Sequence, residues 1–464
     1  MPKKPGGRSR QPELIERSKR PTIPIAPDHR LVVLTDETDW TELEERVDQI
    51  RMSKLKNAAG RPPHLRALIG ALILKATRDM TWREAEDLIR YYAPARYLCG
   101  LTETEWSPDH TTLHDFAVLL GEEGVRLINE YAVKWAVEEK LANPSVVVGD
   151  TTAQEAAIPY PNEAGLMAAF MSSVSTASRR GGAALKNFAE KAHTTFKKAK
   201  EKFRRYRFFA KCKKARLKLL TEMATMVEGT QVRLAQALEE SRAAGHRVSK
   251  YGKVALGKAV QLHETMKSLL PQIRYWLKTG RVAAGKIINV HIPELYSIVR
   301  GKVSKPVEFG LSWGIARLRG GFLLATMALN RRELIDTRFA VRAVDHCIAI
   351  FGRPPRAFAY DRGGYSQENV TALRNKGVVE VGLAPRGQAG WAVGAAAKEK
   401  LIRERALVEA SIGALKSRRY GFNRPRARSA KMMAAYGQLA VLGFNLNKLA
   451  RGLARRNGMV AVAG

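Results

Sequence analysis

The chain has 464 residues, of which 45% are hydrophobic and 27% charged, a balance typical of globular proteins with a buried core. Lys and Arg together number 79 against 44 acidic residues, which gives a formal net charge of +35. We find no apolar run of about 18 residues and no signal-peptide pattern, which argues against a membrane-spanning or secreted protein.

The charge surplus predicts polyanionic partners. Nucleic acid is the first candidate, because counterion release from phosphates drives such binding; an anionic membrane surface is the alternative. The three cysteines, Cys99, Cys212 and Cys347, are far apart and form neither a disulfide framework nor a zinc-binding spacing, so we expect a cytoplasmic protein.

The N-terminal part is predicted to be helical. Residues 1–28 are basic and proline-bearing, and we expect either a flexible arm along DNA or a disordered tail. Residues 29–140 show helical periodicity, with a capping box at Thr81-Trp-Arg-Glu84. Asp109 precedes another helix, and we interpret it as a helix-start residue with a structural role.

A short β-branched run, Ser145-Val-Val-Val-Gly-Asp150, predicts a buried strand that carries a carboxylate at its tip. Residues 165–300 then form a strongly basic and mostly helical block. Its densest part, 197–216, is predicted to be one helix in which aromatic residues recur among the cations. We expect the stripe of Phe196, Phe203 and Phe209 to pack on protein.

Strands and helices alternate in the next segment, 301–450. We predict strands at 306–316, 321–328, 357–361 and 378–383, and helices at 332–351 and 397–418, with a glycine-rich loop at 387–394. Asp361 ends the strand 357–361. A C-terminal tail is expected at 451–464.

Two acids at strand tips and one on a late helix, at Glu409, are the layout of an RNase H-like α/β fold. The predicted fold is therefore an RNase H-like catalytic core, built from residues 141–164 and 301–450. An N-terminal helical domain for DNA binding or dimerisation, 29–140, precedes it, and the large basic insertion interrupts it.

The three carboxylates fit the chemistry of phosphodiester cleavage. Two divalent ions serve the attacking and leaving oxygens of an in-line displacement, and Mg²⁺ prefers oxygen ligands such as carboxylates. Asp150 and Asp361 are therefore candidate metal ligands. The alternative for each is a turn or cap residue.

Glu409 lies in a predicted helix. Arg405 and Lys416, four residues before and seven after it, share its face and would place the carboxylate between two phosphate-seeking cations. The alternative is a solvated helix with an ordinary Arg–Glu pair. Glu404 is the next candidate if Glu409 lies on the wrong side of the sheet.

The pattern Arg405-x3-Glu409-x6-Lys416 resembles the Y-x2-R-x3-E-x6-K signature of bacterial insertion-sequence transposases of the DDE type, with Ile402 at the tyrosine position. Other stretches also resemble this family: Trp106–Phe116, Val148-Gly-Asp150-Thr-Thr, Arg300–Gly310 and Ala359-Tyr-Asp361-Arg-Gly-Gly-Tyr. The resemblance extends over about 55–450.

The resemblance implies a DNA transposase with an RNase H-like fold. It implies that Asp150, Asp361 and Glu409 bind two Mg²⁺ ions, with Mn²⁺ as a substitute, and that Arg405 and Lys416 hold the DNA backbone. The enzyme would recognise terminal inverted repeats, cleave with water and join the 3′-hydroxyl to target DNA. We expect a homodimer or higher oligomer on DNA, in the bacterial cytoplasm at the nucleoid.

Two other classes remain open: a nuclease of the same fold that joins no ends, and a DNA-binding protein without catalysis. In every class, the basic insertion is predicted to grip DNA phosphates. The cations expected to do so are Lys197, Lys198, Arg204, Arg205 and Lys213.

Overall fold

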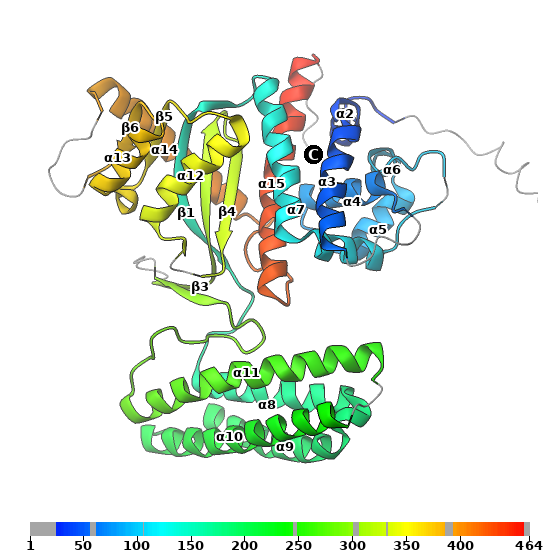
Figure 1. Cartoon of the computed structure of the whole chain (residues 1–464), viewed down its shortest axis with the longest axis vertical. Helices are drawn as coiled ribbons and strands as arrows, with labels where there is room; N and C mark the ends of the chain where they lie inside the picture. The colour runs from blue at the N-terminus through cyan, green and yellow to red at the C-terminus, as the bar shows by residue number, and fades with distance from the viewer. Residues whose placement is uncertain are drawn as a thin grey trace, which may run out of the picture.

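The computed structural model describes residues 25–55, 62–104, 106–244, 248–299, 306–330, 333–385 and 393–458. It is a mixed α/β structure with three parts: a layer of N-terminal helices, a mixed sheet with its covering helices, and a bundle of long helices (Figure 1). No helix in the described ranges is both long and apolar enough to span a membrane.

The N-terminal layer is helical, as the sequence predicts. Its helices are α2 (Arg30–Glu37), α3 (Trp40–Lys54), α4 (Leu65–Thr77), α5 (Trp82–Tyr91), α6 (Ala93–Leu98) and α7 (His110–Glu138). The capping box of α5 is confirmed, since the Thr81 and Glu84 side chains each accept from the other residue's backbone N–H. Asp109 is the N-cap of α7, which confirms its structural interpretation.

The C-terminal helix α15 (Ala430–Arg456) joins this layer and contacts α2, α4 and α7 (Figure 1). It continues past position 451, where the sequence predicts a tail. Asn445 connects the two ends of the chain, because its Nδ2 donates to Asn129 Oδ1 of α7 at 2.7 Å. The last helix thus belongs to the N-terminal core in space, although it is farthest from it in sequence.

The sheet has six strands in the order β2-β3-β1-β5-β6, with β4 also paired to β3. The strands are β1 (Asn143–Glu155), β2 (Tyr296–Val299), β3 (Val307–Arg319), β4 (Leu323–Ala328), β5 (Ala357–Tyr360) and β6 (Glu380–Leu383). The pairs β1–β5 and β5–β6 are parallel and the others antiparallel.

The predicted strand over 306–316 is confirmed as β3, which continues to Arg319. One strand prediction needs correction. Asp150 is not at the tip of β1, because antiparallel pairing with β3 continues the strand to Glu155. On its other edge, β1 pairs with β5 only as far as Val148, so Asp150 lies just beyond the paired residues there.

Helices cover both faces of the sheet. On one face, α12 (Asp336–Phe351) packs on β1 and β3, with Val147 and Phe358 in the shared core. On the other, α14 (Ala395–Leu415) packs on β1, β3, β5 and β6. Helix α13 (Gln367–Asn375) contacts α12 and β6.

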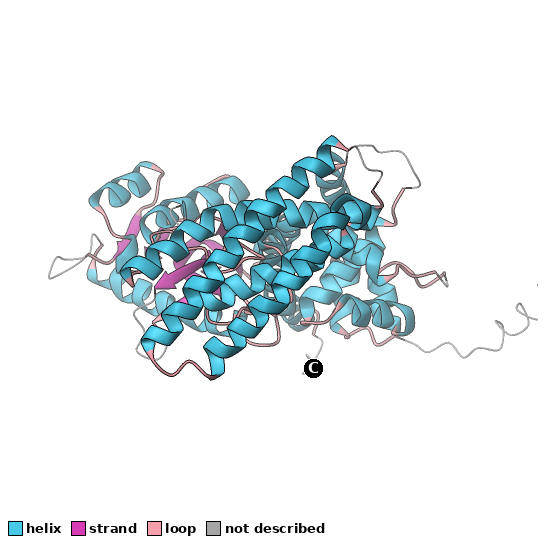
Figure 2. Cartoon of the chain, turned by 90° about the horizontal axis from the view of Figure 1, so that it is seen from below, coloured by secondary structure: helices cyan, strands magenta, loops and turns pink. Residues whose placement is uncertain are grey.

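The basic insertion is a separate helical bundle between β1 and β2, as predicted (Figure 2). Its helices are α8 (Glu163–Arg180), α9 (Lys186–Phe208), α10 (Lys213–Ala243) and α11 (Lys250–Thr279). They share an apolar core to which all four contribute, including Phe170, Phe188, Met223 and Met266.

A single helix over 197–216 is a wrong prediction. The helix α9 ends at Phe208 and α10 begins at Lys213, with Cys212 as its N-cap. The chain reverses there because α9 and α10 bury their apolar faces against each other and against α8. Phe196 and Phe203 pack on the bundle core, whereas Phe209 lies beyond the helix end and is exposed.

Candidate carboxylate site

Asp150 lies on β1, and Asp361 directly follows the last residue of the neighbouring parallel strand β5. In the β1–β5 pairing, Val146 lies opposite Ala357 and Val148 opposite Ala359. Asp150 and Asp361 each follow two residues later, so they lie at the same level of the sheet. Side chains two residues apart on a strand share a face, and Val148 and Ala359 both belong to the core beneath α14. The two carboxylates therefore extend from the face that α14 covers.

The helix α14 is fixed on this face by its apolar residues Leu401, Val408 and Ile412, which are buried in the same core. Their spacing of seven and four residues is that of one helix face. Arg405 falls on this face between Leu401 and Val408. Burial raises the pKa of the Asp361 carboxyl, and the positive charge of Arg405 opposes this rise.

Two contacts define the direction of α14 along β1. Midway along the helix, Glu404 binds Arg317, a β3 residue that is paired with Val148 of β1. Beyond its end, Asn423 accepts a hydrogen bond from the backbone N–H of Glu155 at 3.3 Å. On β1, Asp150 lies between Val148 and Glu155. The part of α14 closest to Asp150 along the strand direction therefore follows Glu404.

Glu409 falls within that part of α14, one helical turn beyond Arg405. It is on the α14 side of the sheet, the side from which Asp150 and Asp361 extend, and its side chain is exposed. Glu404, by contrast, is held by two arginines: Arg317 Nη1 and Arg319 Nε each donate to it at 2.9 Å. Glu404 is thus engaged in an ion-pair network, and Glu409 is the solvent-facing acid of this helix segment.

Asp361 is partly buried and lies near a second acid, Asp336. Burial raises the pKa of its carboxyl, and the nearby charge of Asp336 raises this pKa further. Opposing effects come from Arg405 and from the backbone N–H of Gly363, which donates to Asp361 Oδ1 at 2.9 Å. A half-buried carboxylate with a second acid nearby favours a cation at the site.

Asp336 is an acid that the sequence analysis did not single out. It is the first residue of α12, and its Oδ1 accepts from Thr151 Oγ1 at 2.6 Å and from the Tyr360 hydroxyl at 2.9 Å. Thr151 follows Asp150 and Tyr360 precedes Asp361, so Asp336 ties together the two strands that carry these acids. The sequence signal was weak, because an acid in the first turn of a helix is common.

The donor set fits a hard divalent cation. Asp150, Asp361 and Glu409 offer carboxylate oxygens, which Mg²⁺ and Mn²⁺ accept as ligands. Within the described ranges, no three Asp, Glu, His or Cys side chains are arranged closely enough to hold an ion as they stand. Binding would therefore require the exposed Glu409 side chain to move toward the two strands.

The two predicted phosphate-binding residues of α14 lie at different places. Arg405 is partly buried, and its charge acts on Asp361. Lys416 is the C-cap of the helix, about 16 Å further along its axis at 1.5 Å per residue. It lines a cleft of about 520 Å³ together with Glu155, Arg418 and Arg424. Arg405 and Lys416 thus place positive charges at two points along α14.

The five cations predicted in the insertion are all exposed. Lys197, Lys198, Arg204 and Arg205 lie on α9, and Lys213 begins α10. Arg204 approaches Glu201 at 3.8 Å on the surface, a contact that contributes little to stability.

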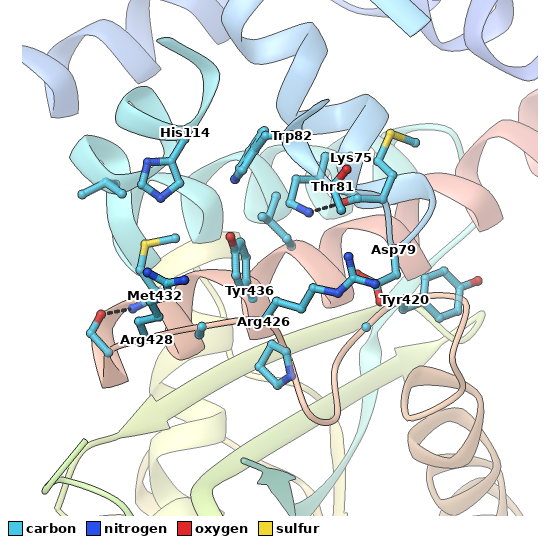
Figure 3. A pocket seen from close by; sticks show the side chains of 18 residues that line it. Lys75, Asp79, Thr81, Trp82, His114, Tyr420, Arg426, Arg428, Met432 and Tyr436 are labelled. Atoms are coloured by element: carbon cyan, nitrogen blue, oxygen red, sulfur yellow. Dashed lines mark hydrogen bonds between the residues drawn. The ribbon is translucent and has the colours of Figure 1, made fainter. Parts of the chain in front are cut away.

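A second cavity, of about 520 Å³, lies between the N-terminal helices and the start of α15 (Figure 3). Lys75 reaches into it between two aromatic rings, with its Nζ 4.9 Å from the Trp82 ring centroid and 5.1 Å from that of Tyr436. Burial lowers the pKa of Lys75 to about 8. Arg426 and Arg428 line the same cavity. No sequence motif marked this cavity, and none of the three predicted catalytic acids lines it.

Comparison with known families finds a match to a transposase domain in the N-terminal helices. Residues 21–118 match the family model described as "Transposase domain (DUF772)". The match covers α2 to α6 and the start of α7, and it ends before Asp150. Neither the curated proteins nor the solved structures gave a match. The family match supports a transposase, and a transposase domain implies DNA as partner and, in general, a DNA-cutting enzyme.

Proposed function

We propose that this protein is a DDE transposase of the insertion-sequence type, with an RNase H-like catalytic core. The proposal rests on the positions of Asp150 and Asp361, each two residues beyond the paired residues of β1 and β5. Helix α14, which packs on both strands, carries Arg405 and Glu409. The family match in the N-terminal layer supports transposition as the biological context.

In the proposed mechanism, Asp150, Asp361 and Glu409 would hold two Mg²⁺ ions, or Mn²⁺ in their place. Such ions activate water or a 3′-hydroxyl and stabilise the leaving oxygen of the scissile phosphodiester. Asp150 and Asp361 are held in place by the strands, whereas Glu409 approaches from the helix. Asp336 maintains the spacing of β1 and β5 through Thr151 and Tyr360.

The cations of the chain orient the DNA. Arg405 lies beside Asp361 and is positioned to contact a phosphate near the scissile bond, and Lys416 would hold the backbone further along α14. The basic bundle adds a surface for duplex DNA, and the net charge of +35 favours rapid association with it. The working form is a homodimer or higher oligomer that holds two transposon ends.

The test is an end-processing assay with the purified full chain. Its substrate is a labelled duplex carrying the terminal inverted repeats that flank the coding sequence, with a supercoiled plasmid as target. We expect strand cleavage at the repeat end and joined products in Mg²⁺ or Mn²⁺, and neither in EDTA. Cleavage without joined products would favour the nuclease of the same fold. Binding without cleavage would favour a non-catalytic DNA-binding protein.

A further inference from the structure

The turn between α9 and α10 exposes two adjacent phenylalanines. Phe208 ends α9 and Phe209 follows it, with 65% and 62% of their surface exposed. Phe196 and Phe203, earlier on the same helix, pack against the bundle core. We call the exposed pair, Phe208 and Phe209, the aromatic apex. Its side chains form no part of the bundle core, so folding of the bundle does not account for them.

Each phenyl ring of the aromatic apex has an arginine against it. The guanidinium of Arg207 lies 5.3 Å from the Phe208 ring centroid, and that of Arg204 lies 5.8 Å from the Phe209 centroid. These cation–π contacts hold the rings on a positively charged surface while both remain largely open to solvent. An exposed aromatic ring surrounded by arginines suits a flat, electron-rich ligand that also carries negative charge.

The charge around the aromatic apex is predominantly positive, with Glu201 near Arg204 and Glu222 bound to Lys202 as its acidic neighbours. Between Phe203 and Thr221 the sequence contains no acidic residue. Its basic residues are Arg204, Arg205, Arg207, Lys211, Lys213, Lys214, Arg216 and Lys218, and all of them are exposed. This concentration of cations favours a polyanion over an apolar protein surface, because a protein partner would have to desolvate these charges.

We propose that the aromatic apex stacks on DNA bases that are unpaired or partly unstacked, while the surrounding cations bind the flanking phosphates. Side chains such as Phe insert between base steps in proteins that kink DNA, and aromatic rings stack on single-stranded bases with little sequence preference. The bundle would therefore select distorted or opened DNA. This inference rests on the proposed DNA binding by the bundle and is independent of the carboxylate chemistry.

The experiment compares two 30-base-pair probes of unrelated sequence, one fully paired and one with a central mismatched bubble of three nucleotides. Binding of the full chain is measured by fluorescence anisotropy at several salt concentrations. We expect the wild type to bind the bubble about tenfold more tightly, within the range of about five- to 150-fold that stacking on one base provides. The double variant Phe208→Ala/Phe209→Ala should lose this preference and keep its affinity for the paired duplex.

Two control variants sharpen the comparison. Phe208→Trp/Phe209→Trp preserves stacking surfaces and should keep the bubble preference. Tyr251→Ala removes another exposed aromatic residue of the bundle, 85% exposed on α11, and should leave both affinities unchanged. Because Phe208 and Phe209 are exposed, the melting temperature of the alanine variant should equal that of the wild type.

The inference is overturned if the alanine variant retains the bubble preference, or if wild type shows none. It is also overturned if the alanine variant changes the oligomeric state in sedimentation and leaves both affinities intact, since the aromatic apex would then contact protein. A wild-type chain that prefers the bubble but never cleaves end DNA would count against the proposed transposase chemistry and not against this inference.

Discussion

Asp150 and Asp361 each lie two residues beyond the paired residues Val148 and Ala359 of the parallel strands β1 and β5. Neighbouring strands are about 4.8 Å apart, so continued alignment of the two chain segments would bring both carboxylates within reach of one divalent ion. The chain segment between them, from Asp150 to Asp361, includes the entire helical bundle. The pairing of β1 with β5 therefore brings together acids that are far apart in sequence.

Glu404 and Glu409 lie on the same helix but should respond differently to loss of charge. Glu404→Gln removes the negative charge that pairs with Arg317, which is 8% exposed, and with Arg319, and it leaves one acceptor oxygen for the two guanidinium groups. Removing one partner of a buried ion pair costs about 3–5 kcal/mol, and the partial exposure of Arg319 should place this variant at the lower end. Glu409→Gln is the matched control and should change the free energy of unfolding by less than about 0.5 kcal/mol. Urea denaturation measures both, and equal effects would contradict these positions of the two acids.

Asp336→Ala should destabilise the protein and impair cleavage. It leaves the fully buried Tyr360 hydroxyl without its acceptor, which costs about 1–3 kcal/mol. Asp345→Ala, on the same helix, breaks an exposed ion pair with Lys376 and should cost no more than about 1 kcal/mol. Thermal unfolding and end cleavage are the measurements. A stable Asp336→Ala protein with wild-type cleavage would show that Asp336 does not position the strands.

Lys75 should make stability depend on pH in the alkaline range. Burial lowers its pKa to about 8 in the folded protein, from an ordinary value of 10.5. Between these values the unfolded chain binds the proton more strongly, so the free energy of unfolding rises with pH across this window. Lys75→Met lacks this rise.

The variant should therefore gain stability relative to wild type at pH 7 and lose that advantage as the pH approaches 10. Urea denaturation at pH 7.5 and 9.5 provides the comparison. The exposed Lys431 on α15 offers a control, since Lys431→Met should change the free energy of unfolding little at either pH. A constant difference between Lys75→Met and wild type would contradict the burial of this ammonium group.

Replacing five exposed cations of the bundle with Gln should weaken DNA binding. The positions are Lys197, Lys198, Arg204, Arg205 and Lys213. Each phosphate contact contributes about 0.9 to the slope of log K against log salt, so the slope should decrease by up to about 4.5. A matched set on α11 and just beyond it, Lys250, Lys253, Lys267, Lys278 and Arg281, should have a smaller effect. Wild-type affinity and salt slope in the first variant would mean that the α9–α10 surface does not hold DNA.

Much of the fold was predictable from local patterns. Helix starts at Thr81 and Asp109 follow from side chains that bond to nearby backbone groups, and these contacts are confirmed. The helical nature of the insertion also follows from periodicity and is confirmed. Such features depend on residues a few positions apart, which the sequence displays directly.

Features that depend on distant pairing were missed. The extension of β1 beyond Asp150 requires β3, which follows only after the bundle. The packing of α15 on α4 and α7 joins the two ends of the chain, and the reversal at Cys212 depends on the faces that α9 and α10 bury. Asp336 becomes significant only when Thr151 and Tyr360 meet it. The catalytic roles of Asp150, Asp361 and Glu409 stay predictions.

The most direct test of the central claim pairs cleavage with binding in three variants, Asp150→Asn, Asp361→Asn and Glu409→Gln. Each removes one carboxylate from the proposed metal site, whereas DNA affinity depends mainly on Lys and Arg elsewhere. End cleavage in Mg²⁺ should therefore be abolished in all three, with mobility shifts of the same end DNA close to wild type. Parallel loss of cleavage and binding, or retained cleavage in any one of them, would contradict a three-carboxylate catalytic site.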